Sequence, residues 1–384
     1  MFKTEDLQTA VKIRQDIHQH PELRYEEHRT AALVAKRLRT LGFEVQTGIA
    51  QTGVIGLLET GRSGPVIALR ADMDALPIVE ATALPYQSVY PGKMHACGHD
   101  GHTASLLLAA AWLAQNRDRL RGTIKLLFQP AEEGGNGAAL MVAEGALAHP
   151  TVDAIFGYHN RPGHKAGLLL LRPGPTMGGN DTYHVTIHGV SGHAAMPHLA
   201  VDPIYIAANI IQQTQGIVGR LKSPLQSGLI TVSAVHAGVA DNAIPGEAKL
   251  TLNIRSDCAA TRAQLIDQLE TLLHGCCTPF GGSYSLSHVN TMPPLVNPPA
   301  AVAAVQAAVQ QYLPTQEILL LEAMPTMGSE DFAYYLEEVT GCYFFIGNGE
   351  TGPYVHNHGY DYNDDILPAA AGVFVAIVQH YCAR

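Results

Sequence analysis

The amino-acid sequence predicts an α/β protein with an open, mixed and largely parallel sheet, interrupted by an inserted α+β domain. In the first half of the chain, short apolar runs with Val and Ile alternate with helical segments, as in sheets that are buried on both faces. From about residue 180 the strands instead alternate apolar and polar residues, as in sheets with one open face. We therefore expect a large domain formed by residues 1–180 and 292–384 and a smaller inserted domain at 181–291.

The elements of the large domain follow from the spacing of its apolar residues. Apolar positions that recur every three or four residues predict amphipathic helices, whereas short continuous apolar runs bounded by Gly or Pro predict buried strands. An Ala- and Leu-rich stretch between two such strands predicts a buried helix. The expected helices lie at 5–19, 27–41, 103–115, 300–312, 331–338 and from 368, and the expected strands at 53–59, 65–70, 123–129, 154–158 and 342–347.

The inserted domain is expected to be ferredoxin-like, with the order β-α-β-β-α-β. The segments TYHVTIHGV (182–190) and EAKLTLNIR (247–255) alternate apolar and polar residues, and helical stretches lie at 201–216 and 259–274. Stretches rich in Gly and Pro, RPGPTMGGND before the domain and TMPPLVNPP after it, mark the two crossings between the domains.

Composition and charge argue against several classes of partner. With 24 Lys and Arg against 34 Asp and Glu, the formal net charge is −10, which disfavours binding to a nucleic acid or an anionic membrane. No uninterrupted apolar run reaches the roughly 18–20 residues that a membrane span needs, and the N-terminal residues lack the apolar centre of a signal peptide. Six cysteines in 384 residues do not make a disulfide scaffold. We expect a soluble, cytoplasmic protein.

A histidine-rich run, MHACGHDGHT (94–103), is the first candidate for chemistry. Cys97 and His99 flank a single glycine, so a thiolate and an imidazole can turn toward one metal ion or a close pair. A loop of this composition by coincidence is the alternative. The density of ligand-type residues in so short a stretch favours the metal.

Two more groups follow predicted strands. Glu132 and Glu133 come after the strand at 123–129, and on a tight turn one carboxylate can bind a metal while the other takes a proton from water. A solvated acidic turn is the alternative. His159 follows the strand at 154–158, the position where ligands collect in open α/β sheets.

The tail segment YVHNHGYD (354–361) offers a further histidine ligand. Added to the thiol, the two imidazoles and the carboxylate named above, it makes five protein ligands. That number exceeds a tetrahedral zinc site and fits two metals that share a bridging ligand.

Three polar residues of the inserted domain stand in positions that can face a ligand. His193 lies beside a glycine after an alternating strand, where it can reach a neighbouring site as an oxyanion partner. Asn242 precedes an Ile-Pro pair, and Arg255 closes the strand at 247–255. An Arg fork suits a carboxylate, although an exposed strand-end charge is equally compatible with the pattern.

The ordered motifs resemble the M20 metallopeptidase family, and within it the amidohydrolase branch of hippurate hydrolases, N-acyl-amino-acid deacylases and plant auxin-conjugate hydrolases. The resemblance covers nearly the whole chain and implies a metal-binding catalytic domain with an inserted lid and dimerisation domain. The motifs that carry it are HQHPELRYEE (18–27), ALRADMDALP (68–77), MHACGHDGHT (94–103), FQPAEEGGNGA (128–138), GYHN (157–160), GVSGHAAMPH (189–198), GSEDFAYY (328–335) and HNHGYDYNDDILP (356–368).

The resemblance implies five metal ligands: Cys97, His99, Glu133, His159 and His356. Counting back from Leu367-Pro368 favours His356 as the last of them, but His358 stands where relatives usually have Pro and remains the alternative. Asp74 matches an aspartate that orients a ligand. Asp72 replaces a metal-binding His of the wider family, so we do not expect it to be a ligand.

The resemblance also implies roles in catalysis and substrate binding. Glu132 would be the general base and proton shuttle. His193 would stabilise the tetrahedral oxyanion, in many relatives from the lid domain of a dimer partner, which implies a homo-oligomer, a dimer or tetramer. Asn242 and Arg255 would hold the oxyanion and the free carboxylate of the substrate.

Together these inferences predict a dinuclear metal-dependent amidohydrolase. It would cleave the linear amide of N-acyl amino acids, hippurate-like or N-acetylated, and release a carboxylic acid and a free amino acid. Two divalent ions, Zn, Mn, Co or Ni, suit a Cys, His and Glu ligand set. A dipeptidase or carboxypeptidase of the same family is the nearest alternative. The others are a cysteine hydrolase that pairs Cys97 with His99 or His102, and a non-catalytic ligand-binding module, which the presence of Glu132 disfavours.

Overall fold

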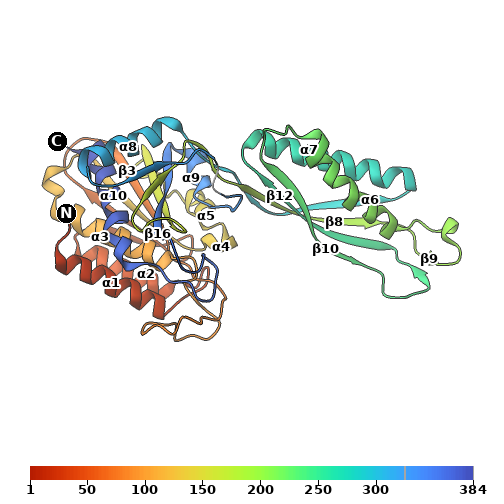
Figure 1. Ribbon diagram of the computed structural model, residues 1–384, viewed down its shortest axis with the longest axis horizontal. Coiled ribbons are helices and arrows are strands. Elements are labelled where there is room, and N and C mark those ends of the chain that lie inside the picture. The colour runs from red at the N-terminus through yellow and green to blue at the C-terminus, as the bar shows by residue number, and fades with distance from the viewer. Residues whose placement is uncertain (324–325, 384) are drawn as a thin grey trace. The chain divides into compact units, whose positions relative to one another are not determined.

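The computed structural model describes residues 1–323 and 326–383 and confirms the predicted mixed α/β class (Figure 1). The chain divides into two compact units, which are described separately. The first unit comprises Met1–Gly174, Asn297–Ala323 and Tyr334 to the C-terminus, and the second comprises Pro175–Val296 and a short segment that ends at Ala333.

The first unit is built on an eight-stranded sheet. Its strands are β1 (Glu44–Ile49), β2 (Gly53–Glu59), β3 (Val66–Asp72), β4 (Thr123–Gln129), β5 (Ala154–Pro162), β6 (Leu169–Leu171), β15 (Ile318–Leu320) and β16 (Gly341–Gly349). Their order is β1-β2-β4-β3-β5-β16-β6-β15, in which β4, β3, β5 and β16 are parallel and β2 is antiparallel to both its neighbours. The parallel strands are buried along most of their length, which explains their continuous apolar sequences.

Five long helices complete the first unit: α1 (Thr4–Gln19), α2 (His28–Thr40), α3 (His99–Gln115), α8 (Pro299–Tyr312) and α10 (Leu367–Cys382). The α3 helix packs against α1, α10 and β3 and is buried on all sides, so its sequence has no polar face. Among the described residues, only Asp364–Cys382 is long and apolar enough to cross a membrane, and 67% of it is buried in the protein, as in a core helix.

The second unit has the predicted ferredoxin-like order. Its main elements are β8 (Gly179–His188), α6 (Pro203–Gly216), β10 (Gly228–Ala237), β12 (Glu247–Ser256), α7 (Ala259–Cys277) and β13 (Ser283–Met292). The strands form an antiparallel sheet in the order β10-β12-β8-β13. Apolar residues that alternate along β8 and β12 pack against the apolar sides of α6 and α7. That packing is why these strands alternate in sequence.

Short elements make the connections: α4 (Glu132–Gly135), α5 (Gly137–Ala143), α9 (Ala333–Glu338), β7 (Gly174–Met177), β9 (Gly192–His193), β11 (Ala243–Ile244) and β14 (Leu295–Asn297). Two of the structure's differences from the sequence prediction bear on the site. The predicted helix at 103–115 begins earlier, so that His99 lies in its first turn, and β5 runs to Pro162, so that His159 lies within the strand and not after it.

The segment around Ser329 groups with the second unit, although the sequence pattern assigns it to the large domain at 292–384. The backbone N–H of Gly178 donates to the carbonyl of Gly328 (2.8 Å), and Arg255 donates to the hydroxyl of Ser329 (2.7 Å). Bonds between residues this distant in sequence leave no local pattern, so the sequence could not predict this boundary.

Candidate active site

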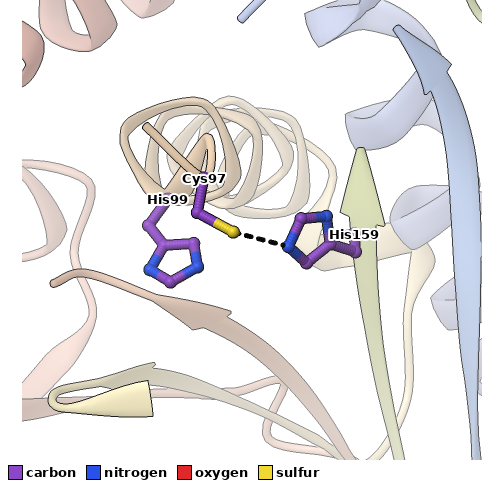
Figure 2. A group of neighbouring side chains, drawn as sticks. All are labelled: Cys97, His99 and His159. Carbon is purple, nitrogen blue, oxygen red and sulfur yellow. Dashed lines mark hydrogen bonds between the residues drawn. The ribbon is translucent and has the colours of Figure 1, made fainter. Parts of the chain in front are cut away.

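The predicted site residues of the first unit gather at one edge of its sheet. The parallel strands β3 and β4 end together, at Asp72 and Gln129, and β5 lies beside β3. Figure 2 shows Cys97 and His99 at the start of α3, facing His159 on β5. The carboxyl ends of parallel strands are where open α/β sheets bind ligands.

Cys97 and His159 are in direct contact. The Cys97 Sγ atom lies 3.2 Å from His159 Nε2, while His159 Nδ1 lies 2.6 Å from the carbonyl oxygen of Asn160 (Figure 2). The carbonyl accepts from Nδ1–H, so Nε2 presents its lone pair to the sulfur. Burial holds the pKa of His159 well below its usual value, which keeps the imidazole in the neutral form that binds metals.

The two ring nitrogens of His99 have different surroundings. Its Nδ1 lies 2.9 Å from the Asp74 carbonyl oxygen and 3.1 Å from Asp74 Oδ1. Its Nε2 is buried and has no hydrogen-bond partner among the described residues; it lies 3.8 Å from an Asp72 oxygen and 3.9 Å from a Glu132 oxygen. Burial opposes a charge on this ring, but the nearby carboxylates, chiefly Asp72 and then Asp74, raise its pKa to about 10. The surroundings therefore favour a cation at Nε2.

The side chains of Glu133 and His356 also lie close to each other. Glu133 Oε1 lies 3.1 Å from His356 Nε2, at ion-pair distance, yet within the described part of the chain this buried oxygen accepts no hydrogen bond. The backbone N–H of Glu133 donates to Asp74 Oδ2 (2.9 Å), so Asp74 orients both Glu133 and His99. The backbone N–H of His356, which has φ +66°, donates to the carbonyl of Ala96 beside Cys97 (2.7 Å).

His358 is placed differently from His356. Its carbonyl accepts from the backbone N–H of Ala81 (2.8 Å). Within the described residues, His358 belongs to none of the side-chain groups close enough to hold a metal ion, whereas His356 belongs to one with Cys97 and Glu133. The geometry therefore favours His356 of the two tail histidines.

The candidate ligands form two groups that share one sulfur. Cys97, His99 and His159 make one group, and Cys97, Glu133 and His356 the other, with the donor atoms of each group within 4.8 Å of one another. Burial, with the charges of Glu133 and Glu132, raises the pKa of the Cys97 thiol well above its usual value. A thiolate here therefore needs a cation beside it, and the unpaired His99 Nε2 and Glu133 Oε1 fit the same requirement.

The turn that carries the two glutamates is not a regular helix, although it is labelled α4 in Figure 1. Ala131 and Gly134 have left-handed φ values of +54° and +74°, and Glu133 has a ψ of +70°. These values let the adjacent side chains of Glu132 and Glu133 serve different partners. Glu133 faces His356, whereas a Glu132 oxygen lies 3.9 Å from His99 Nε2.

Asp72 and His102 also lie close to His99, but their polar atoms are occupied. Asp72 accepts from Arg70 Nη1 through Oδ2 and from His102 Nδ1 through Oδ1, both at 2.6 Å. His102 Nε2 lies 2.7 Å from Asn160 Oδ1. This closed network supports the expectation that Asp72 is not a ligand. The sequence reasoning missed Arg70 and Asn160, and their only signal was their place in motifs already recognised.

Gly98 has a conformation that the site requires. Its φ is +98°, and a Cβ at this position would meet the side chain of Asn160 and lie 2.7 Å from the Tyr360 hydroxyl. Gly98→Ala is expected to lower the free energy of unfolding by about 2–4 kcal/mol, the sum of backbone strain and overpacking. Gly92, with φ +82° and open space around its Cβ position, is the matched control, and Gly92→Ala should cost only about 1 kcal/mol. Urea unfolding measures both, and equal losses would contradict the packing argument.

The predicted site residues of the second unit lie in two places. His193 in β9 pairs with Ala243 in β11, and the Asn242 carbonyl accepts from the backbone N–H of Ala194 (3.0 Å), so His193 and Asn242 are neighbours on an exposed two-stranded ribbon. Arg255 lies near the end of β12, where its Nε donates to Asn253 Oδ1 (2.8 Å) and its Nη1 to Ser329.

These two places are at opposite ends of one sheet. The ribbon adjoins Glu247, at the start of β12, and Arg255 comes eight residues later, about 26 Å away at roughly 3.3 Å per residue. The second unit of one chain therefore does not bring His193 and Arg255 to the same small molecule.

A sequence profile of peptidase family M20/M25/M40 matches residues 68–380, most of the chain. The chain belongs to the M20 family. It is 38% identical over 370 residues to the hippurate hydrolase of Campylobacter jejuni, with 96% of each chain covered. It is 36% identical over 368 residues to a thermostable carboxypeptidase of Saccharolobus solfataricus, with 94% of this chain and 92% of the relative covered. A solved structure from Bacillus subtilis, described as a dinuclear metal binding peptidase from the M20 family, matches with a TM-score of 0.86 at 30% identity over 98% of both chains.

Membership of the M20 family places the chain among metal-dependent hydrolases and argues against a cysteine hydrolase. Cys97 contacts His159, and not the His99 or His102 that were expected as its partner in a cysteine hydrolase. A nucleophilic cysteine also needs a lowered thiol pKa, whereas the pKa of Cys97 is raised.

Proposed function

We propose that this protein hydrolyses the amide bond of N-acyl amino acids with two divalent metal ions. Cys97, His99 and His159 would hold one ion, and Cys97, Glu133 and His356 the other. The observation that carries the proposal is the Cys97 sulfur, which belongs to both ligand groups and needs a cation to ionise. When bound, the metals supply Lewis acidity, which makes a water nucleophilic at neutral pH and polarises the acyl carbonyl.

Glu132 supplies the proton transfers. Its carboxylate is largely buried and lies beside His99 and Glu133, within the ligand cluster. It takes a proton from the attacking water and returns that proton to the nitrogen of the leaving amine. Asp74 contributes by orientation, since it fixes both the ring of His99 and the backbone of Glu133.

We propose that Arg255 binds the free carboxylate of the substrate and that His193 stabilises the negative charge of the reaction intermediate. Asn253 and Ser329 hold the guanidinium of Arg255 through Nε and Nη1, which leaves its Nη2 edge for the free carboxylate of the amino acid. His193, with Asn242, would stabilise the oxyanion of the tetrahedral intermediate. Because His193 and Arg255 lie at opposite ends of one sheet, we propose that a partner chain supplies His193, in a homodimer or a tetramer built from such dimers.

The identity of the metals and the cellular location are also proposals. A mixed Cys, His and Glu set accepts Zn, Mn, Co or Ni, and availability decides among them. We propose a cytoplasmic location, and the acidic composition suits an enzyme that acts on a small molecule.

A carboxypeptidase or dipeptidase is the second candidate, favoured by the likeness to the S. solfataricus carboxypeptidase. Both reactions cleave an amide next to a free carboxylate, so Arg255 would serve either. They differ on the acyl side, where a dipeptide carries a free amine and an N-acyl amino acid does not.

A substrate panel separates the two candidates. With Mn²⁺ or Zn²⁺ supplied, we expect kcat/KM for hippurate and N-acetyl amino acids to exceed that for dipeptides with a free amine by at least about tenfold, because an ammonium group must lose its hydration beside the metals (about 1.4 kcal/mol per tenfold). The measurement is amino-acid release. A preference for the dipeptides would establish the peptidase instead.

A further inference from the structure

The turn that carries Glu132 and Glu133 has a backbone that needs external support. Ala131 and Asn136, at its two ends, both adopt left-handed conformations with φ +54°, which residues other than glycine rarely do. Such a conformation persists only where surrounding contacts impose it. The question is which residues supply those contacts.

A segment more than 100 residues earlier in the sequence supplies three of them. The carboxylate of Glu27 accepts a hydrogen bond from the backbone N–H of Ala131 through Oε1 (2.9 Å). Arg24 Nη1 donates to the carbonyl of Glu133 (3.2 Å), and the Tyr25 hydroxyl donates to the carbonyl of Gly135 (2.6 Å). The three bonds are made to the beginning, the middle and the end of the turn.

Glu27 is an unusual residue to find in this position. Its side chain is fully buried, and its second oxygen accepts from the hydroxyl of Thr52 (2.6 Å). Burial, reinforced by the charge of Asp74 although the Thr52 hydroxyl counteracts it, raises the pKa of Glu27 to about 7. Burying a carboxyl group is costly unless its hydrogen bonds are needed. The bond to Ala131 gives Glu27 a function that a surface glutamate could not perform.

We propose that Arg24, Tyr25 and Glu27 form a brace that positions Glu132 and Glu133, and that Glu27 is its principal positioning residue. The brace touches neither the substrate nor the reacting atoms. It fixes the backbone from which the general base and one metal ligand project, and so gives a role to Arg24, Tyr25 and Glu27 in the N-terminal motif at 18–27. The proposal rests on the proposed function, because it assumes that Glu132 and Glu133 act in hydrolysis.

The expected consequence is a loss of turnover without a loss of substrate binding. A displacement of about 1 Å in a catalytic group costs on the order of 10²-fold in rate. We therefore expect Glu27→Ala to lower kcat about 10²-fold and to leave KM within about threefold. Glu27→Gln should recover most of the rate, because its amide oxygen can still accept from the Ala131 N–H. Tyr25→Phe should lower kcat about tenfold, since it removes one bond of the brace.

The matched control is Glu26→Ala. Glu26 is adjacent in sequence, but its side chain is exposed and bonds only to Lys93 among the described residues (2.7 Å). The kcat of this variant should stay within twofold of the wild type. Bound metal is measured in every variant, so that a rate loss at full occupancy is separated from a loss of the ions.

Hydrogen exchange of the metal-free protein tests the brace without substrate. In a peptide that covers residues 128–138, Glu27→Ala and Tyr25→Phe should each speed amide exchange at least about tenfold, and Glu26→Ala should not. If the substrate panel shows no hydrolysis, the proposed function fails while this measurement still judges the brace.

The proposal would be overturned if folded, metal-loaded Glu27→Ala had the kcat and amide exchange of the wild type, or if it changed KM alone. It would also be overturned if Glu27→Gln or Glu26→Ala lost as much kcat as Glu27→Ala. If Glu27→Ala does not fold, Tyr25→Phe decides, and unchanged turnover and exchange in that variant would overturn the brace.

Discussion

Replacing Glu132 by Gln is expected to lower kcat by about 10³- to 10⁴-fold while the fold and the metal content stay unchanged. The amide has nearly the shape of the carboxylate, so it preserves the packing of this largely buried side chain. It cannot accept a proton from water or return one to the leaving amine. Steady-state kinetics, together with metal analysis of the same preparation, measures both parts of the prediction.

Glu133→Gln is the matched comparison, since Glu133 is the adjacent residue on the same turn. Its carboxylate faces His356 within a candidate ligand group. Its replacement should therefore cause the loss of metal as well as the loss of activity. The two neighbouring substitutions therefore have different expected results. Glu132→Gln should lose activity but keep its metal, whereas Glu133→Gln should lose activity because it loses metal. A Glu132→Gln enzyme with more than a tenth of the wild-type turnover would refute the proton-shuttle role.

Replacing Cys97 by Ser should cause the second large effect, the loss of at least one metal ion on dialysis and a fall in kcat/KM of at least about 10²-fold. A serine hydroxyl is a far weaker ligand than a thiolate, and Cys97 is the one side chain common to both ligand groups. Metal content after dialysis is the primary measurement. Cys258→Ser is the control, because Cys258 is a free cysteine of the second unit that belongs to none of the possible metal-binding groups among the described residues. Metal content unchanged by Cys97→Ser would contradict ligation.

The same residue separates metal from thiol catalysis. A chelator should abolish the activity of the wild-type enzyme, and added metal should restore it. A cysteine hydrolase would survive the chelator and lose its activity to iodoacetamide instead. The raised pKa of the Cys97 thiol makes that second pattern unexpected.

The sequence could predict the candidate ligands because each belongs to a short motif next to a buried strand or helix. Cys97 and His99 are held by the start of α3, and Glu133 follows β4, so local sequence and strand order together bring them to one edge. The choice between His356 and His358 was harder, since both stand in the same irregular segment. It depends on the position of His356 beside Cys97 and Glu133, and on a backbone bond from His356 to Ala96 that no sequence pattern encodes.

What the sequence could not predict depends on contacts between distant residues. The hydrogen bonds of Asp72 to Arg70 and His102 favour a structural role for an acidic residue that lies close enough to His99 to share a metal ion. The bond from Ala131 to Glu27 joins residues 104 positions apart and gives a role to a motif that otherwise had none. Similarly, the grouping of Ser329 with the second unit follows from its bond to Arg255.

The position of the metal ions tests the central claim most directly. Anomalous diffraction from crystals grown with Mn²⁺ or Zn²⁺ should show two ions, both within bonding distance of the Cys97 sulfur, about 2.3 Å for zinc. His99 and His159 should complete one coordination shell, and Glu133 and His356 the other. A single ion, or two ions that do not share the sulfur of Cys97, would contradict the account.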